Sequence, residues 1–187
     1  VAASSIYGEA LATISGEVKE GSIVNGDENV YTLSKKGESL DEGKYEVVLT
    51  VNNDSYVAKI DNESVRYTIK PREITVKISD VGTTYGDNEA SFVYSLNEGS
   101  SLGYNDSLDS VIRVSREAGN AAGKYAITAE GINHNYDVTF EYSDKANKRS
   151  YYYINKRGIT LNVNDIEVDY KKSYEEVAEK FGYEIEG

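Results

Sequence analysis

The sequence predicts a mainly β protein built from small modules in tandem. Apolar and polar residues alternate over five or more positions, tyrosine occurs 17 times in 187 residues, and short motifs recur at a nearly constant interval. Alternation with period two buries one side of a strand and exposes the other, and tyrosine suits such half-buried pleated surfaces. We expect each module to be a small immunoglobulin-like β-sandwich with a short helix, and a β-grasp arrangement is the alternative.

The recurring motifs divide the chain into three segments. They follow one another in the same order, and 78 positions (85 minus 7) separate the first pair. The pairs are Tyr7-Gly8-Glu9 with Tyr85-Gly86-Asp87, Asp27 with Asp106, Gly43-Lys44-Tyr45 with Gly123-Lys124-Tyr125, Asn53-Asp54-Ser55-Tyr56 with Asn133-His134-Asn135-Tyr136, and Tyr67-Thr68-Ile69 with Tyr153-Ile154-Asn155. A third copy opens at Val168-Asp169-Tyr170-Lys171, where Lys171 replaces the glycine. We expect a diverged first module at residues 1–73, a complete second module at 74–158 and the start of a third at 159–187.

Helical segments are few. Ser107 follows Asn105 and Asp106, so a polar N-cap stands ahead of the apolar residues at 108 and 111 and predicts a short helical turn there. A longer helix is expected at residues 173–181, where Ser173 can cap the first turn and Gly182 can end the last. The junctions at 70–73 and 155–158 join strand to strand directly, so we expect neighbouring modules to be held in a fixed, extended arrangement.

Composition excludes several classes of function. The formal net charge of −12 opposes binding to phosphate backbones and to anionic membranes, and it favours a solvated acidic surface. The absence of cysteine excludes disulfides and thiol chemistry. No apolar run approaches the roughly 20 residues of a membrane span, so we expect no membrane insertion. The absence of methionine indicates a processed chain or a piece of a longer precursor.

The motifs of the second segment resemble the MBG domain of large bacterial surface adhesins. The residues that carry the resemblance are Ile74, Val76, Tyr85-Gly86-Asp87, Ser115-Arg116-Glu117-Ala118-Gly119, Gly123-Lys124-Tyr125-Ala126-Ile127, Asn135-Tyr136 and Tyr153-Ile154. The resemblance covers residues 74–158 well and 6–73 more loosely, because the first copy lacks the Arg-Glu-Ala-Gly motif and has Glu9 for the aspartate. It implies a tandem, β-rich extracellular module that spaces or binds, and it implies no catalytic residues.

Three residues are candidates for ligand binding because they stand where the copies differ. His134 is the only histidine, and it occupies the place of Asp54 in the first copy, which favours a turn residue over a general base. Tyr151 and Tyr152 could offer aromatic faces to sugar rings. The alternative for both is a strand with alternating buried and exposed rings, and the alignment of Tyr153 with Tyr67 gives Tyr153 a structural role.

Two kinds of polar site are alternatives to plain turns and surface charge. The loops 24–29 and 105–109 offer oxygen ligands for calcium, but Val30 stands where the twelve-residue calcium loop has glycine, and a plain turn is favoured. The 32 acidic residues make carboxylate pairs frequent by chance, and none is marked as the two-carboxylate site of a glycosidase. We therefore expect no enzyme activity and no cofactor, with calcium as the one open alternative.

The repeats, the short junctions and the absence of cysteine favour a non-catalytic stalk or spacer module of a bacterial cell-surface adhesin. One alternative is a module that itself binds a host glycoprotein or polysaccharide, and another is an accessory module of a secreted enzyme. Each of these functions places the chain outside the cell, on the bacterial surface or cell wall or secreted, beside neighbouring modules of the same chain. None of them involves nucleic acid.

Overall fold

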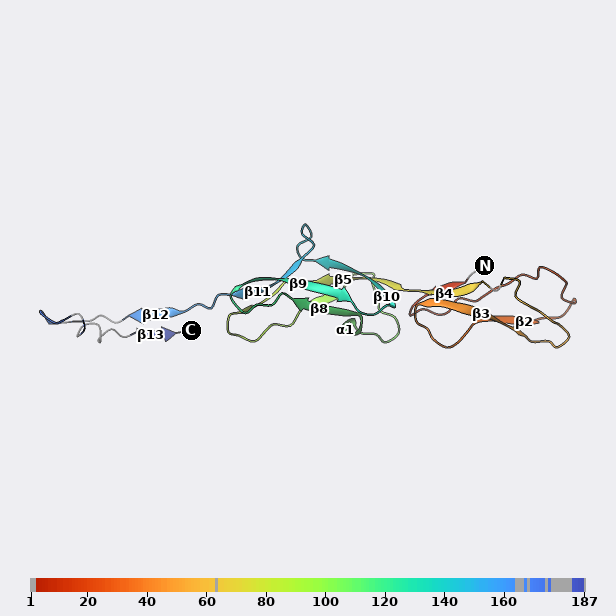
Figure 1. The fold of residues 1–187 in the computed structure, drawn as a ribbon, viewed down its shortest axis with the longest axis horizontal. Coiled ribbons are helices and arrows are strands. Elements are labelled where there is room, and N and C mark those ends of the chain that lie inside the picture. The colour runs from red at the N-terminus through yellow and green to blue at the C-terminus, as the bar shows by residue number, and fades with distance from the viewer. Residues whose placement is uncertain are drawn as a thin grey trace.

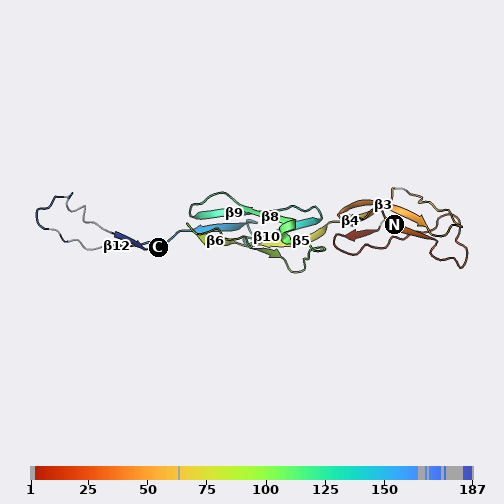
Figure 2. The same ribbon diagram turned by 90° about the horizontal axis from the view of Figure 1, so that it is seen from below.

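The computed structural model describes residues 3–62, 64–163, 167, 169–173, 175 and 183–186. Three sections follow one another along the long axis in both views (Figures 1 and 2). We call residues 3–70 the N-terminal unit, residues 72–155 the central unit and residues 160–186 the C-terminal section. Strands dominate each section, which confirms the prediction of a mainly β protein.

The N-terminal unit holds one four-stranded sheet. Its strands are β1 (Ser4–Ile6), β2 (Tyr31–Lys35), β3 (Gly43–Val51) and β4 (Arg66–Lys70). They lie in the order β1-β4-β3-β2, with β1 parallel to β4 and the other pairs antiparallel. Alternate positions of β3 and β4 face the protein interior, as the period of two predicts.

The central unit holds two sheets. Its elements are β5 (Arg72–Ile78), β6 (Val81–Thr84), β7 (Tyr94–Leu96), α1 (Leu108–Val111), β8 (Ile112–Arg116), β9 (Gly123–Gly131), β10 (Tyr136–Tyr142) and β11 (Ser150–Asn155). One sheet has the order β10-β5-β7 and the other β6-β11-β9-β8. β4 ends at Lys70 and β5 begins at Arg72, so only Pro71 separates the sheet of one unit from the sheet of the next.

Both sheets of the central unit supply side chains to one core. Val76 and Ile78 of β5 pack in the same cluster as Ile127 of β9 and Tyr152 of β11, and each of the four is at most 3% exposed. Two strand pairs are parallel, β5 with β10 and β6 with β11, whereas an immunoglobulin-like sandwich is antiparallel. The short helix predicted before Val111 is present as α1, a single turn that follows Ser107.

The sheet of the N-terminal unit matches the second sheet of the central unit strand for strand. In both, a short parallel strand lies beside a central strand, and the central strand pairs antiparallel with the strand that starts at Gly43 or Gly123. Tyr45 lies opposite Tyr67, and Tyr125 lies opposite Tyr152. The counterpart of Tyr67 is therefore Tyr152, and the alignment of Tyr67 with Tyr153 is wrong by one residue. Because strand register alternates faces, that single step moves a ring from one face of the sheet to the other.

The C-terminal section has strands β12 (Thr160–Val163) and β13 (Tyr183–Glu186), which pair antiparallel. The helix expected at residues 173–181 lies almost entirely outside the described residues. Tyr170 and Lys171 form a turn, and Lys171 has a φ of +79°, close to the +81° and +88° of Gly8 and Gly86. Lysine thus adopts here the left-handed conformation that glycine supplies in the two other copies of the motif.

Candidate functional site: the contact between the units

The N-terminal and central units meet at a cluster of tyrosines. The ring of Tyr7 from the N-terminal unit packs edge-on against Tyr104 and Tyr136 of the central unit, with centroid distances of 5.1 and 5.4 Å. Such edge-to-face pairs are favourable beyond the area that they bury. Tyr7 is 7% exposed, although it lies in a turn between strands, because the central unit covers it.

Asp106 joins the two units through hydrogen bonds. Its Oδ2 accepts the hydroxyl of Tyr136 at 2.7 Å and the hydroxyl of Tyr7 at 3.1 Å. The Tyr136 hydroxyl also accepts the backbone N–H of Gly103 at 2.8 Å, so it is used as donor and acceptor. Burial, and then the hydrogen bond to Asp106, raise the pKa of Tyr136 to about 12, and the same two causes raise the pKa of Tyr7. Both hydroxyls therefore stay protonated donors at neutral pH.

Two glycines allow the backbones to touch. Gly8 has a φ of +81°, and a Cβ added there would lie 2.3 Å from the Cα of Gly103. A Cβ added to Gly103 would in turn lie 2.9 Å from the Cα of Gly8. Glycine at position 8 is thus needed for two reasons: the positive φ of the turn and the close approach to the backbone of Gly103.

Arg72 closes one side of the contact. Its Nε donates to the backbone carbonyl of Tyr7 at 2.8 Å, and its guanidinium also reaches Ser101 at 3.1 Å and Glu9 at 3.4 Å. The side chain of Arg72 is 15% exposed, so these bonds are partly shielded from water. A planar guanidinium with several donors suits this bridging position, since a single ammonium cannot reproduce the fork.

Asn135 closes the other side. Its side-chain oxygen accepts the N–H of Glu42 at 2.7 Å, and its side-chain nitrogen donates to Asp41 at 2.9 Å. The hydrogen bond from Asn135, followed by that from Ser39, lowers the pKa of Asp41. Asn135 is 5% exposed. The contact therefore has a tyrosine and glycine centre with polar clamps on either side.

The structure separates the three predicted binding residues. His134 is exposed in the turn between Asn133 and Tyr136, where Tyr136 N–H donates to the Asn133 carbonyl at 3.1 Å. Tyr152 is 1% exposed, and its hydroxyl accepts the N–H of Ala90 at 2.7 Å. Tyr152 is thus a core residue, because it lies on the inner face of β11. Its counterpart Tyr67 accepts the N–H of Ala12 in the same way, at 2.8 Å.

Tyr151 lies on the opposite face of β11, with its ring half-buried. The rings of Tyr151 and Tyr153 are 6.3 Å apart, and the ammonium of Lys124 stands 3.5 Å from the centre of the Tyr151 ring. This arrangement is a cation–π contact on a sheet surface. It brings together Tyr151, Tyr153 and Lys124, and neither Tyr152 nor His134 belongs to it.

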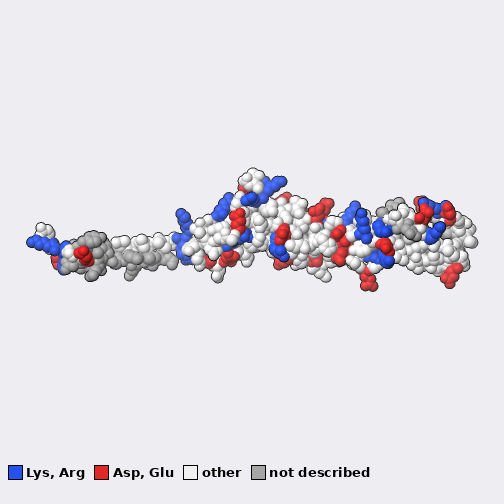
Figure 3. Space-filling model, viewed as in Figure 1, with Lys and Arg blue, Asp and Glu red and all other residues white. Residues whose placement is uncertain are grey.

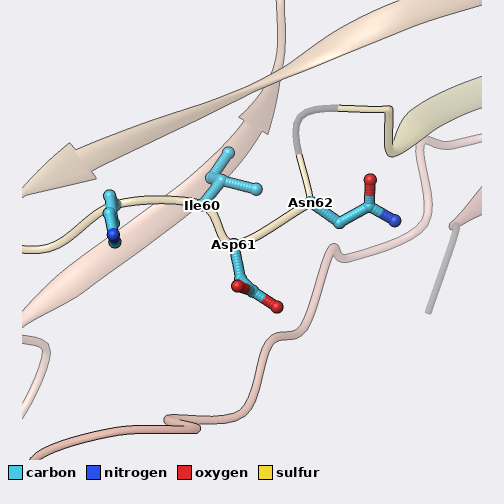
Figure 4. A pocket seen from close by; sticks show the side chains of 4 residues that line it. Ile60, Asp61 and Asn62 are labelled. Carbon is cyan, nitrogen blue, oxygen red and sulfur yellow. The ribbon is translucent and has the colours of Figure 1, made fainter.

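The described residues contain no group of three or more histidine or acidic side chains arranged to hold a metal ion. In each loop considered for calcium, one carboxylate accepts a tyrosine hydroxyl: Asp27 from Tyr56 at 2.5 Å and Asp106 from Tyr136. Figure 4 shows a surface hollow lined by residues 59–62, in which Asp61 accepts a hydrogen bond from the exposed Lys19 at 2.5 Å. That bond lowers the pKa of Asp61. The polar group in the hollow is therefore one half of an exposed ion pair with Lys19.

Acidic and basic side chains are interspersed over the face shown in Figure 3. Within the described residues, none of the helices is long and apolar enough to cross a membrane.

The fold and the contact define a class of protein, a chain of small β modules joined end to end. Residues 74–144 match the family model of the MBG domain, YGX type, which supports the resemblance that the motifs of this segment carry. The match spans less than half of the chain and ends before β11, although β11 lies between β6 and β9 in the sheet. No curated protein and no solved structure matches the chain.

The sequence patterns alone predict no role for several residues of the contact between the units. Tyr7, Asp106 and Asn135 join the two units, and the recurrence of their motifs does not predict this role. Arg72 could have been found, since an arginine follows Lys-Pro at the first junction and Lys at the second. The hydrogen bonds from Arg72 and Arg157 to the Tyr-Gly turns give these two arginines the same role.

Proposed function

We propose that this chain is part of a non-catalytic spacer in an extracellular bacterial adhesin, where tandem modules hold a distal binding part away from the cell surface. The observation that carries the proposal is the contact between the units, in which Tyr7 is covered and Asp106 accepts a hydroxyl from each unit. A spacer needs such contacts, because flexible linkers give a coil whose ends approach one another.

The match of residues 74–144 to the MBG family model supports the repeat character of the chain. The elongated arrangement in Figure 1 supports a role that depends on length, since the two units add their long dimensions. In a repeat array each unit contacts only its neighbours, so the stiffness of the whole depends on contacts of this kind. The extracellular location and the bacterial cell-surface setting belong to the same proposal.

The distance between the units tests the spacer role. The chain has no cysteine, so cysteines placed at the exposed positions Ser34 and Glu141 would be the only spin-labelling sites. Pulsed electron–electron double resonance between spin labels at these two positions should give one narrow distance distribution in the otherwise unchanged chain. Asp106→Ala removes the acceptor of both tyrosine hydroxyls and should broaden that distribution.

Asp27→Ala is the matched control. Asp27 accepts the hydroxyl of Tyr56 as Asp106 accepts that of Tyr136, but both Asp27 and Tyr56 belong to the N-terminal unit, so this bond does not join the two units. It should leave the Ser34–Glu141 distance narrow. A broad distribution in the unsubstituted chain would refute the spacer role.

A second function is favoured by one observation, the pair of rings of Tyr151 and Tyr153 with Lys124 above them. We propose as the alternative that this surface binds a polysaccharide or the glycan of a host glycoprotein, because aromatic faces pack against the apolar faces of sugars. Glycan-array binding that Tyr151→Ala abolishes would support it. Tyr152→Phe, which changes only a core hydroxyl, is the control for misfolding, and absence of binding across the array would count against this alternative.

A further inference from the structure

The far end of the central unit repeats the end of the N-terminal unit that is used in the contact. Gly86 has a φ of +88° where Gly8 has +81°. The Nε of Arg157 donates to the carbonyl of Tyr85 at 2.8 Å, which is the same bond at the same distance as that from Arg72 to Tyr7. The guanidinium of Arg157 also pairs with Asp87, as that of Arg72 pairs with Glu9. We call Tyr85, Gly86, Asp87 and Arg157 the distal surface.

The two ends differ in what covers them. Tyr7 is 7% exposed and Tyr85 is 53% exposed. A Cβ added to Gly8 would meet the backbone of Gly103 at 2.3 Å, whereas a Cβ added to Gly86 would have its nearest neighbour, Arg157 Nε, at 3.6 Å. The distal surface therefore has the conformation of a docking surface, while its tyrosine is left half exposed among the described residues.

A neighbouring loop also repeats. The hydroxyl of Tyr45 donates to the carbonyl of Asp41 at 2.7 Å, and the hydroxyl of Tyr125 donates to the carbonyl of Ala121 at 2.7 Å. In the first loop the next N–H, that of Glu42, donates to Asn135 of the central unit. Ala122 holds the matching position in the second loop, so its N–H lies where an asparagine of a following module would accept it.

Each unit also carries the other half of the contact. In the central unit this half is a clasp, in which the Tyr136 hydroxyl donates to Asp106 and accepts Gly103 N–H at 2.8 Å. In the N-terminal unit Tyr56 donates to Asp27 at 2.5 Å and accepts Val24 N–H at 2.9 Å. The clasp is therefore a repeated part of the module, and a further module of this kind would bring its own.

The chain past Arg157 begins such a module. β12 and β13 pair with Leu161 opposite Ile185 and Val163 opposite Tyr183, as β5 and β7 pair with Val76 opposite Leu96 and Ile78 opposite Tyr94. The turn at Tyr170-Lys171 lies between these two strands in the chain, and Lys172 N–H donates to the Asp169 carbonyl at 3.4 Å. Glu9 N–H and Asp87 N–H donate in the same way in the two earlier copies, at 3.1 and 3.0 Å.

We infer that the distal surface is the docking site for the clasp of the next module in the same chain. The inference rests on the proposed spacer function and names the partner that this end of the unit takes. The tyrosine of the distal surface packs between two aromatic rings of the incoming module, and its hydroxyl donates to the aspartate of the clasp. The net charge of −12 opposes end-to-end association of separate chains, which favours a partner already tethered at residue 158.

The test is an extended chain in which a second copy of residues 74–158 follows position 158 in place of residues 159–187. Cysteines at Glu141 of the central unit and at the same position of the copy report the new contact, and the Ser34–Glu141 pair reports the old one. We expect one narrow distance for each pair. Tyr85→Ala should abolish the narrow distance of the new pair and leave the Ser34–Glu141 distance unchanged, and Tyr7→Ala should do the reverse.

Gly86→Ala gives a second, sharper variant. In the 187-residue chain it should disturb folding only through the strained φ, because the added Cβ has room. In the extended chain it should also abolish the new contact, since the Cβ would meet the glycine of the clasp as it would at Gly8. Gly8→Ala, the matched substitution, should broaden the Ser34–Glu141 distance in both chains.

Three outcomes would overturn the inference. A broad distribution for the new pair beside a narrow Ser34–Glu141 distribution would refute docking at the distal surface while the spacer function stands. Broad distributions for both pairs would refute both proposals. Head-to-tail association of the 187-residue chain in sedimentation experiments, lost in Tyr85→Ala, would assign the surface to a second copy of the chain.

Discussion

The N-terminal and central units share one four-stranded sheet, but only the central unit has a second sheet among the described residues. That second sheet is built on β5, which pairs with β10 over seven residues and with β7 on its other side. In the N-terminal unit, residues 56–62 align with β10 and contain no strand. A strand with no neighbour leaves its backbone groups unpaired. The difference between the units therefore indicates that β5, the strand ahead of the Tyr-Gly motif, is needed for the second sheet of the module to form.

The largest effect that follows from this comparison is expected in β5. Ile78→Ala removes a side chain that is 1% exposed, and it should lower the free energy of unfolding of the central unit by about 2–5 kcal/mol. Val57→Ala, in the segment that lacks a strand, is the control, because Val57 is fully exposed and its loss should change stability by less than about 0.5 kcal/mol. Urea unfolding followed by circular dichroism measures both. Similar losses in the two variants would contradict the difference between the units.

The second prediction compares the hydroxyl of Tyr136, which lies in the contact between the units, with that of Tyr56 in the N-terminal unit. Tyr136 has a pKa of about 12 in the folded protein, above the value of about 10 for an unfolded tyrosine, so its contribution to stability is complete below pH 10 and is lost as the pH rises through 12. Stability should fall in that window, by at most about 1.4 kcal/mol per pH unit for this group. Tyr136→Phe should remove this part of the decline and should cost about 1–3 kcal/mol at neutral pH, because Gly103 N–H loses its acceptor.

Tyr56→Phe is the matched variant in the N-terminal unit. The hydrogen bond to Asp27 is the first cause of the raised pKa of Tyr56, whereas burial is the first cause for Tyr136. The pH dependence of stability should therefore change less in Tyr56→Phe than in Tyr136→Phe. Equal changes in the two unfolding profiles would show that covering by a neighbouring unit adds nothing to the clasp.

The smallest effect is local. It tests whether a strand equivalent to β5 would allow residues 56–62 of the N-terminal unit to form a second sheet. A copy of residues 72–78 added ahead of Val1 would occupy the place that β5 holds ahead of β6, and it should pair in parallel with residues 56–62. Amides of that segment should gain protection in hydrogen exchange, because they would then donate to a neighbouring strand. A copy in which Ile74, Val76 and Ile78 are replaced by asparagine should give no protection. Unprotected amides in both chains would show that a preceding strand does not complete the unit.

Much of the architecture could be predicted from local sequence. Alternation of apolar and polar residues predicts that strands dominate, and the polar residues before Leu108 predict the single turn of α1. The exact register could not be predicted, because Tyr151-Tyr152-Tyr153 offers three tyrosines to one partner position. Only the pairing of β11 with β9, which sets Tyr152 opposite Tyr125, decides that Tyr152 is the buried ring. A candidate sugar-binding residue thus proved to be the counterpart of Tyr67.

The sequence by itself determined that this protein is a set of similar β-rich units, because recurrence of motifs and alternation of polarity are local properties. Only the tertiary structure decided what the recurring residues do. Tyr7 and Asp106 are 99 positions apart and Gly8 and Gly103 are 95 apart, and each pair meets across two units. The same motif is buried at Tyr7 and exposed at Tyr85, since burial depends on whether a neighbouring unit packs against it.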